Sequence, residues 1–281
     1  MKTLAVLVFS ALSLFFFQHT CASMITPSNC GSSYVGWQSY NWCIHNNGTT
    51  DSGTALYYFH GNGGSEKSWQ TPEHEQLAQL WSKHKEKPAA VISVSFGKSW
   101  FLNPNLQDGL IRKVIPNIES QLGFPVRRRF LLGESMGGFN AAVVAGINNR
   151  TFDKIAILCP AVYNINPYTS STEINKFIAA QPAGVNTGFI VKWLDKQRDS
   201  FRNGAEFAKY DPITSVKQSS APLFIMGDEA DSLGVYEGAK LMAANARAKG
   251  INLSWWSIPQ GEHCQHSTAS LAALAQFLGT P

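Results

Sequence analysis

Residues 131–138 read Leu-Leu-Gly-Glu-Ser-Met-Gly-Gly and join an apolar segment with strand character to a segment with helical character. The pattern Gly-x-Ser-x-Gly, from Gly133 to Gly137, therefore falls where a strand must turn sharply into a helix. Such a turn holds the serine in a strained conformation and raises its hydroxyl above the sheet. The two glycines come close together in the turn, where a Cβ atom would clash. Ser135 is thus a candidate nucleophile, and the helix that begins at Met136 directs amide groups toward developing negative charge.

Six short apolar runs are rich in β-forming residues, and each is predicted to be a strand. Most are apolar at every position, which is typical of parallel strands covered by helices on both sides. The last run contains the adjacent residues Trp255 and Trp256 and could also lie at the edge of a sheet. The predicted strands are Ala55–Phe59, Ala89–Val94, Phe130–Leu132, Ile155–Leu158, Leu223–Met226 and Leu253–Ile258.

Helical patterns alternate with these runs. Pro72 suits the first position of a helix, Glu73 suits its positive end, and Gly250 is placed as the C-cap of another helix. Alternation of strands and helices predicts an α/β fold with a mainly parallel central sheet and helices on both faces. The helices are predicted over residues 72–81, 110–122, 136–147, 236–249 and 267–278.

The segment 161–221 interrupts this alternation and is predicted to be an insertion. It contains several aromatic residues and helix-like stretches near Glu173–Ala180 and Thr187–Arg198. The insertion either forms a cap that lines a substrate pocket or covers an edge of the sheet, and the sequence favours the two equally.

Residues 1–23 have the layout of a secretory signal peptide. Lys2 precedes an apolar run from Leu4 to Phe17, and small residues follow it. The run is shorter than the roughly 20 apolar residues that a membrane span needs. We therefore expect a secreted or periplasmic protein without stable membrane insertion, in which residues 24–281 form one domain.

Four cysteines remain beyond this segment. In an oxidising compartment Cys30 and Cys43 could close a short loop by a disulfide bond, whereas the sequence assigns no partner to Cys159 or Cys264. There is no Cys-x-x-Cys and no His-Glu-x-x-His motif, so no metal site is predicted.

The net charge of +4 comes from scattered basic residues. The one dense basic run, Arg127–Arg129, precedes an apolar strand, and a solvated strand edge explains it better than nucleic-acid binding does. No nucleic-acid partner is expected.

A serine hydroxyl is a poor nucleophile at neutral pH, so it needs a base within hydrogen-bonding reach and an acid that orients the base. Two polar clusters, residues 227–233 and residues 259–263, follow the C-terminal ends of predicted strands, where open α/β sheets place their sites. In the first, Asp231 is the preferred acid because a loop of several residues lets its side chain reach sideways, while Asp228 and Glu229 remain alternatives. In the second, His263 follows a turn-forming glycine and is the preferred base, whereas His266 is expected to open the final helix.

Residues 57–65, Tyr-Tyr-Phe-His-Gly-Asn-Gly-Gly-Ser, follow the first long apolar run. Glycines allow such a loop to offer backbone amides to an oxyanion. We assign this role to the amides of Asn62 and Met136, with Gly63 as an alternative to Asn62. His60 is expected to order the loop by hydrogen bonding. A phosphate-binding loop is disfavoured because there is no Gly-Lys-[Ser/Thr] and no Gly-x-Gly-x-x-Gly.

Together, His-Gly-Asn-Gly-Gly at 60–64 and Gly-Glu-Ser-Met-Gly-Gly at 133–138 resemble the α/β-hydrolase superfamily. They look most like its secreted esterases of the esterase-D-like and polymer-depolymerase-like kinds, and the similarity in motif order extends from Ala55 to the C-terminus. The chain departs from that pattern in the spacing of the acid from Gly227, which is four residues where three is common. The resemblance implies a nucleophile, an acid, a base and two oxyanion-binding amides at Ser135, Asp231, His263, Asn62 and Met136, respectively.

The activity implied by this resemblance is hydrolysis of a small-molecule or polymeric carboxylic ester through an acyl-enzyme, without a cofactor. An acyltransferase of the same fold, a serine peptidase and a catalytically inactive binding protein are the alternatives. Trp100, Phe101 and the aromatic residues of the insertion could line an apolar pocket, but core packing explains them equally well.

Overall fold

The computed structural model describes residues 25–46, 52–97, 104–147 and 150–280. The predicted signal peptide and the aromatic residues Trp100 and Phe101 lie outside the described residues. Within these ranges, no helix combines the length and the apolar character that crossing a membrane requires.

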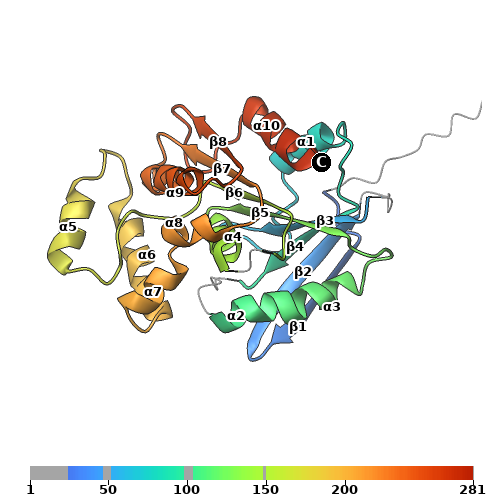
Figure 1. The fold of residues 1–281 in the computed structure, drawn as a ribbon, viewed down its shortest axis with the longest axis horizontal. Coiled ribbons are helices and arrows are strands. Elements are labelled where there is room, and N and C mark those ends of the chain that lie inside the picture. The colour runs from blue at the N-terminus through green and yellow to red at the C-terminus, as the bar shows by residue number, and fades with distance from the viewer. Residues whose placement is uncertain (1–24, 47–51, 98–103, 148–149, 281) are drawn as a thin grey trace, which may run out of the picture.

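In the described chain, eight strands form one sheet in the order β1-β2-β4-β3-β5-β6-β7-β8 (Figure 1). Strands β3 to β8 pair in parallel, whereas β1 and β2 form an antiparallel hairpin that joins the sheet at β4. The prediction of a mainly parallel sheet is confirmed, and β8 lies at an edge. The strands are β1 (Asn29–Val35), β2 (Gln38–Asn46), β3 (Thr54–Phe59), β4 (Ala90–Ser95), β5 (Arg128–Glu134), β6 (Lys154–Leu158), β7 (Leu223–Asp228) and β8 (Leu253–Ile258).

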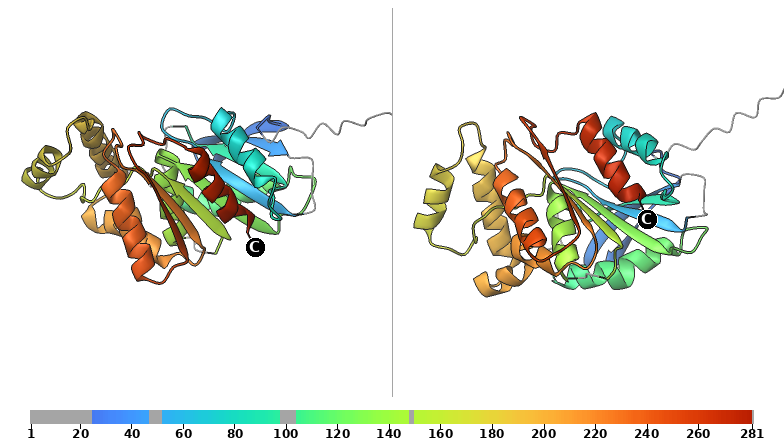
Figure 2. Two further views of the ribbon diagram at one scale, coloured as in Figure 1. Left: turned by 90° about the horizontal axis from the view of Figure 1, so that it is seen from above. Right: turned by 45° about the horizontal axis from the view of Figure 1, so that its top comes forward.

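Helices cover both faces of the sheet, as predicted (Figures 1 and 2). Helices α1 and α10 lie side by side on one face, and α3, α4 and α9 pack on the other. The helices are α1 (Pro72–Trp81), α2 (Pro104–Gly109), the π-helix η1 (Leu110–Val114), α3 (Ile115–Glu119), α4 (Met136–Ile147), α5 (Ser171–Ala179), α6 (Thr187–Ser200), α7 (Gly204–Tyr210), α8 (Pro212–Ser215), the 3₁₀-helix η2 (Val216–Gln218), α9 (Tyr236–Ala248) and α10 (Thr268–Gly279).

The central strands are apolar on both sides because each faces two cores. In β3, Tyr57 and Phe59 belong to the core beneath α4, whereas Leu56 and Tyr58 belong to the core beneath α1 and α10. Every residue of β3 is buried. Removal of this apolar surface from water stabilises the sheet and fixes the strand ends from which the predicted site loops start.

The β1–β2 hairpin is not among the predicted strands. Its second strand buries Tyr40, Trp42 and Ile44, which alternate with Ser39, Asn41, Cys43 and His45, whereas its first strand is mostly Ser, Gly and Asn. The two strands meet at a two-residue turn in which Gly36 has φ +61°, a conformation that favours glycine. The alternation in β2 is the signal that identifies this hairpin in the sequence.

The disulfide bond predicted between Cys30 and Cys43 is present and joins opposite residues of this hairpin. It covalently fastens β1, the first strand of the described chain, to β2. Because β2 pairs with β4, the bond connects the N-terminal segment to the body of the sheet.

The basic run Arg127–Arg129 lies at the start of β5, which has a neighbouring strand on each side, so its interpretation as a strand edge is wrong. The Arg129 guanidinium donates to both carboxylate oxygens of Glu119, at 2.6 and 2.7 Å. Arg128 forms an ion pair with Glu86. The charges of Arg128 and Arg129 are therefore paired with acidic side chains.

The helix predicted over residues 110–122 begins and ends earlier, because α2, η1 and α3 form one helical segment over residues 104–119. In its middle, the Ile115 amide donates to the carbonyl of Leu110, which is the π-helical pattern. Pro116 follows directly and has no amide hydrogen for an α-helical bond. The change of pattern before Pro116 accommodates that missing donor.

The insertion over residues 161–221 folds into helices α5 to α8 and η2 at one side of the sheet (Figure 1). The ring of Trp193 in α6 meets Phe139 of α4 edge to face, with centroids 5.2 Å apart. Tyr163, Trp193 and Phe201 are all buried. These aromatic side chains therefore pack as part of the core.

Candidate active site

Ser135 stands at the sharp turn between β5 and α4. Its φ of +53° lies in the left-handed region, which costs a residue other than glycine about 1–3 kcal/mol. Hydrogen bonds fix this conformation, because the Ser135 amide donates to the carbonyl of Leu158 at 3.0 Å and the Ser135 carbonyl accepts from Phe139 and Ala161 at 2.9 and 3.1 Å. The strained turn predicted from the sequence is thus found in the structure.

Three glycines allow this turn to pack directly on neighbouring backbone. A Cβ atom on Gly137 would overlap the carbonyl of Phe59 at the end of β3, and one on Gly133 would overlap the carbonyl of Gly137. A Cβ atom on Gly138 would approach the Leu158 carbonyl oxygen to 2.7 Å. Helix α4 therefore begins against the ends of β3 and β6, with Ser135 between them.

The structure brings the predicted nucleophile, base and acid into one chain of hydrogen bonds. The Ser135 hydroxyl donates to Nε2 of His263 at 2.7 Å, and Nδ1–H of His263 donates to Oδ2 of Asp231 at 2.7 Å. The second oxygen, Oδ1, accepts from the amide of Leu233 at 2.7 Å. The Asp231 side chain is fully buried, while that of His263 is 19% exposed. A carboxylate held in this way fixes the imidazole tautomer that leaves Nε2 free to accept a proton.

The alternative acids and base lie beside this chain of hydrogen bonds. Asp228 is buried at the end of β7, where burial and the negative charge of Asp231 raise its pKa to about 6. Glu229 accepts a hydrogen bond from a serine of β8, and His266 donates to Glu134. The imidazole of His263 therefore has Asp231 as its carboxylate partner.

The loop that follows β3 lies against Ser135. A Cβ atom on Gly61 would be 3.4 Å from the Cβ of Ser135, and the Gly64 amide donates to the Gly61 carbonyl at 3.1 Å. Asn62 and Gly63 occupy the exposed tip of this turn, with Gly63 at φ +82°. Both candidates for the first oxyanion-binding amide are therefore in the loop next to Ser135, and the choice between them stays a prediction.

His60 orders the start of this loop, as expected. Its Nδ1–H donates to the carbonyl of Gly61 at 2.7 Å, so its Nε2 accepts from the hydroxyl of Ser95 at 2.8 Å. Burial lowers the pKa of His60, which favours the neutral imidazole that these two roles require.

The second predicted amide belongs to Met136, the first residue of α4. The first four amides of a helix have no acceptor within that helix. They also lie at the positive end of the helix dipole. The position of Met136 therefore suits the binding of an anion next to Ser135.

A second disulfide bond, between Cys159 and Cys264, lies beside His263 and was not predicted. Cys159 follows β6, and Sγ of Cys264 is 3.7 Å from Nε2 of His263. The bond ties the loop that carries the imidazole to the strand next to β5. In the part of the chain that the structure describes, His263 and these two cysteines have the spacing of metal ligands, but sulfurs joined in a disulfide offer no thiolate.

The insertion supports the loop that carries Asp231. The amide of Asn186 donates to the carbonyl of Ser232 at 2.7 Å. The hydroxyl of Tyr163 donates to the carbonyl of Leu233 at 2.7 Å. Because these bonds hold the two residues directly after Asp231, the insertion helps to set the position of the carboxylate.

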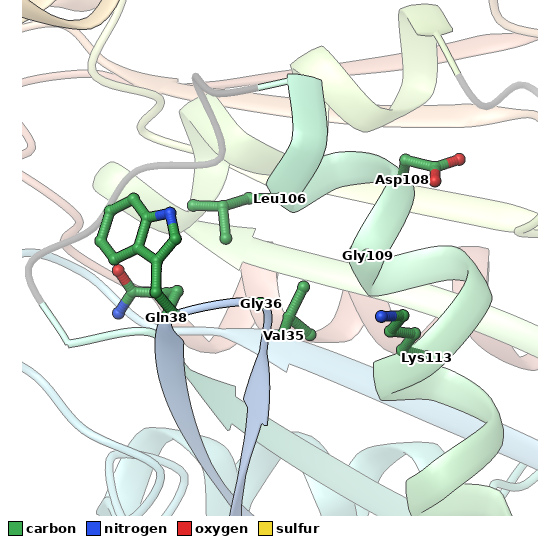
Figure 3. A pocket seen from close by; sticks show the side chains of 8 residues that line it. Val35, Gly36, Gln38, Leu106, Asp108, Gly109 and Lys113 are labelled. Atoms are coloured by element: carbon green, nitrogen blue, oxygen red, sulfur yellow. The ribbon is translucent and has the colours of Figure 1, made fainter.

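A cavity of about 330 Å³ lies between the tip of the β1–β2 hairpin and the helical segment of α2 and η1 (Figure 3). Val35 and Leu106 line it from the two sides, together with the Asp108 and Lys113 side chains. As far as the structure describes its walls, they include none of the predicted site residues. This cavity is therefore separate from the arrangement around Ser135.

Solved esterase structures share the fold over most of this chain. A thermostable esterase from Pseudomonas putida is similar with a TM-score of 0.63 and 17% identity, covering 90% of this chain and 81% of its own. A hyperthermophilic esterase from Pyrobaculum calidifontis is similar with a TM-score of 0.64 and 17% identity, covering 92% of this chain and 88% of its own. A fungal esterase from Rhizomucor miehei is similar with a TM-score of 0.61 and 12% identity, covering 92% of this chain and 85% of its own. The protein therefore has the predicted α/β-hydrolase fold. No protein-family model matches the sequence, and no curated protein does.

The two disulfide bonds are expected to differ in their effect on stability. They span 105 residues at Cys159–Cys264 and 13 residues at Cys30–Cys43. In the chain-entropy model a closed loop of 100 residues corresponds to about 4.7 kcal/mol and one of 15 residues to about 3 kcal/mol. Replacing both cysteines of a pair with serine should therefore lower the free energy of unfolding more for the first pair. Denaturant unfolding of the two double variants measures this, and the opposite ranking would contradict it.

Asp228→Asn is expected to stabilise the protein above pH 6. The pKa of Asp228 is raised from 3.8 to about 6, so the wild type loses stability as the pH rises through that range and the carboxylate ionises in the folded state. A shift of this size corresponds to at most about 3 kcal/mol. The asparagine lacks the charge, so its free energy of unfolding at pH 7–8 should exceed that of the wild type by up to this amount. If the free energies of unfolding of the variant and the wild type differ by the same amount at every pH from 4 to 8, the raised pKa of Asp228 is contradicted.

Proposed function

We propose that the protein is a serine hydrolase that cleaves a carboxylic ester. The observation that carries this proposal is the continuous chain of hydrogen bonds from Ser135 through His263 to the buried carboxylate of Asp231. An imidazole held at Nδ1 by a carboxylate can take the serine proton at Nε2. The fold shared with solved esterases supports an ester as the substrate.

In the proposed reaction, Oγ of Ser135 attacks the ester carbonyl carbon while its proton passes to Nε2 of His263. The carbonyl oxygen becomes an oxyanion, which the amides of Asn62 and Met136 stabilise. The intermediate collapses and expels the alcohol, which takes the proton from His263 and leaves the acyl group on Ser135. Water then attacks the acyl group with His263 as base, which releases the acid and restores the serine. Asp231 stays ionised throughout and stabilises the imidazolium.

The substrate that suits this site best is a small ester, because the proposed nucleophile is buried and the proposed base is only slightly exposed. Ser135 is 8% exposed and the His263 side chain is 19% exposed. A polymer that contains ester bonds is the second candidate substrate. The two disulfide bonds and the predicted signal peptide support a secreted or periplasmic location, because structural disulfides persist in oxidising compartments.

Ser135→Ala is expected to lower kcat for p-nitrophenyl acetate by on the order of 10⁶, because the variant has no nucleophile for the acyl-enzyme step. The matched control is Ser82→Ala, which removes the hydroxyl of an exposed serine at the end of α1 and should hydrolyse the ester at the wild-type rate. Release of p-nitrophenol measures both. A folded Ser135→Ala variant with the wild-type rate would show that the nucleophile is another residue.

Two further measurements identify the intermediate and its acceptor. A fluorophosphonate probe should add to the peptide that contains Ser135, which mass spectrometry detects. With an alcohol added to the reaction, free acid as the only acyl product shows that water is the acceptor, whereas a new ester shows acyl transfer. Absence of labelling together with absence of turnover would point to a binding protein.

A further inference from the structure

The residue between Gly133 and Ser135 is a glutamate whose carboxylate lies on the side of the sheet that faces α1 and α10. Its Oε2 accepts from the hydroxyl of Tyr58 at 2.7 Å. Its Oε1 accepts from Nε2–H of His266 at 3.0 Å and lies 3.3 Å from Nε2 of His74. The side chain of Glu134 is only 14% exposed, so these three groups take the place of water around a buried charge.

Each partner of Glu134 belongs to a different segment of the proposed site. Tyr58 is in β3, two residues before His60. His74 is in the first turn of α1, at the far end of the loop that begins at His60. His266 comes three residues after His263. Since Glu134 is covalently bonded to Ser135, one carboxylate connects the segments of the nucleophile, the oxyanion loop and the base.

The histidine partners are themselves held in place. His74 is buried, and its ring stacks on that of Trp69 with centroids 4.1 Å apart and planes 18° apart. Its Nδ1 is 3.0 Å from the hydroxyl of Thr71, the N-cap of α1. His266 is followed by Ser267, whose side chain and that of Ser270 form the capping box of α10. The carboxylate therefore joins rigid helix ends.

We propose that Glu134 is a positioning residue that holds the segment carrying His263 and the loop carrying Asn62 in register with Ser135. The proposal rests on the function proposed above. Glu134 acts through its neighbours and does not touch the reacting atoms. Its effect is to keep the imidazole and the oxyanion-binding amide within reach of the nucleophile, and a displacement of about 1 Å at such a site can cost on the order of 10² in rate.

The charge of the pair formed by Glu134 and His266 depends on pH. Burial alone would raise the pKa of Glu134, but the charge of His74 and the hydrogen bond from His266 outweigh burial and hold that pKa well below its usual range. Burial lowers the pKa of His266, but its hydrogen bond to Glu134 and the surrounding carboxylates outweigh burial and raise it. The other ionisable groups around the pair are Asp228 of β7, Glu73 and His74 of α1 and Tyr58 of β3.

A cavity of about 510 Å³ opens onto Glu134 between α1 and the residues after His263. Ser68, Thr71 and Gln265 are among its lining residues. Protons in solution can therefore reach the pair of Glu134 and His266. As the pH rises through the raised pKa of His266, the ion pair becomes a hydrogen bond from a neutral imidazole to the Glu134 carboxylate, which is weaker.

The test compares three variants with the wild type in p-nitrophenyl acetate hydrolysis from pH 6 to pH 10. Glu134→Gln keeps the shape of the side chain and removes its charge, and should lower kcat on the order of 10²-fold at unchanged KM. The kcat of the wild type should fall to a lower plateau at alkaline pH, where His266 loses its proton. In Glu134→Gln this alkaline step in kcat should move to lower pH. The control is Glu75→Gln, which removes an exposed carboxylate from the turn of α1 that also carries His74. It should match the wild type in kcat and in the pH dependence of kcat.

His266→Gln is the variant that stays informative if Glu134→Gln fails to fold. Its amide can donate to Glu134 but has no proton to lose, so the alkaline step should disappear while hydrolysis continues. A wild-type kcat and profile in folded Glu134→Gln, or an unchanged alkaline step in His266→Gln, would overturn the positioning role alone. A wild type that neither hydrolyses the ester nor reacts with the fluorophosphonate probe would overturn the proposed function, and the positioning role with it.

Discussion

The close contact between the first turn of α4 and the ends of β3 and β6 is the constraint on which the site depends. Gly137 lies against the carbonyl of Phe59, and the distance left between the two backbones is too small for a Cβ atom. The chain can leave β5 and enter α4 in this space only by a sharp turn, and Ser135 takes the left-handed conformation that the turn imposes. Backbone packing therefore sets the position of the proposed nucleophile, independently of the hydrogen bonds of its side chain.

The other groups reach Ser135 because parallel strands end at the same edge of the sheet. The loops after β3, β7 and β8 carry Asn62, Asp231 and His263, and each loop is fixed by contacts of its own. The insertion holds the loop of the proposed acid, and a disulfide bond holds the loop of the proposed base. Fixed groups of this kind cost little reorganisation when charge develops on a bound carbonyl. The rigidity of the loops is thus a part of the proposed chemistry.

The sequence predicts those features of this arrangement that depend on neighbouring residues. The apolar strands, the sharp turn at Ser135 and the start of α1 at Pro72 are local patterns, and the structure agrees with them. The carboxylate network of Glu134 and the bond between Cys159 and Cys264 join residues far apart in the chain, so no spacing reveals them. The order of strand, acid loop and histidine loop indicates Asp231 and His263, but it does not show which of Asp228 and Asp231 points at the imidazole, and in the structure Asp231 does.

Local rules of protein structure are broken at several positions near the proposed nucleophile. Ser135, Cys159 and Cys264 have positive φ without being glycine, and Asp228 is a buried carboxyl group with a raised pKa. Each of these features costs free energy, and the two apolar cores and the disulfide bonds offset that cost. Features that served stability alone would have no reason to gather at one edge of the sheet around a serine and an imidazole. Their concentration there is what a site selected for chemistry would produce, and it is an argument independent of the likeness to solved esterases.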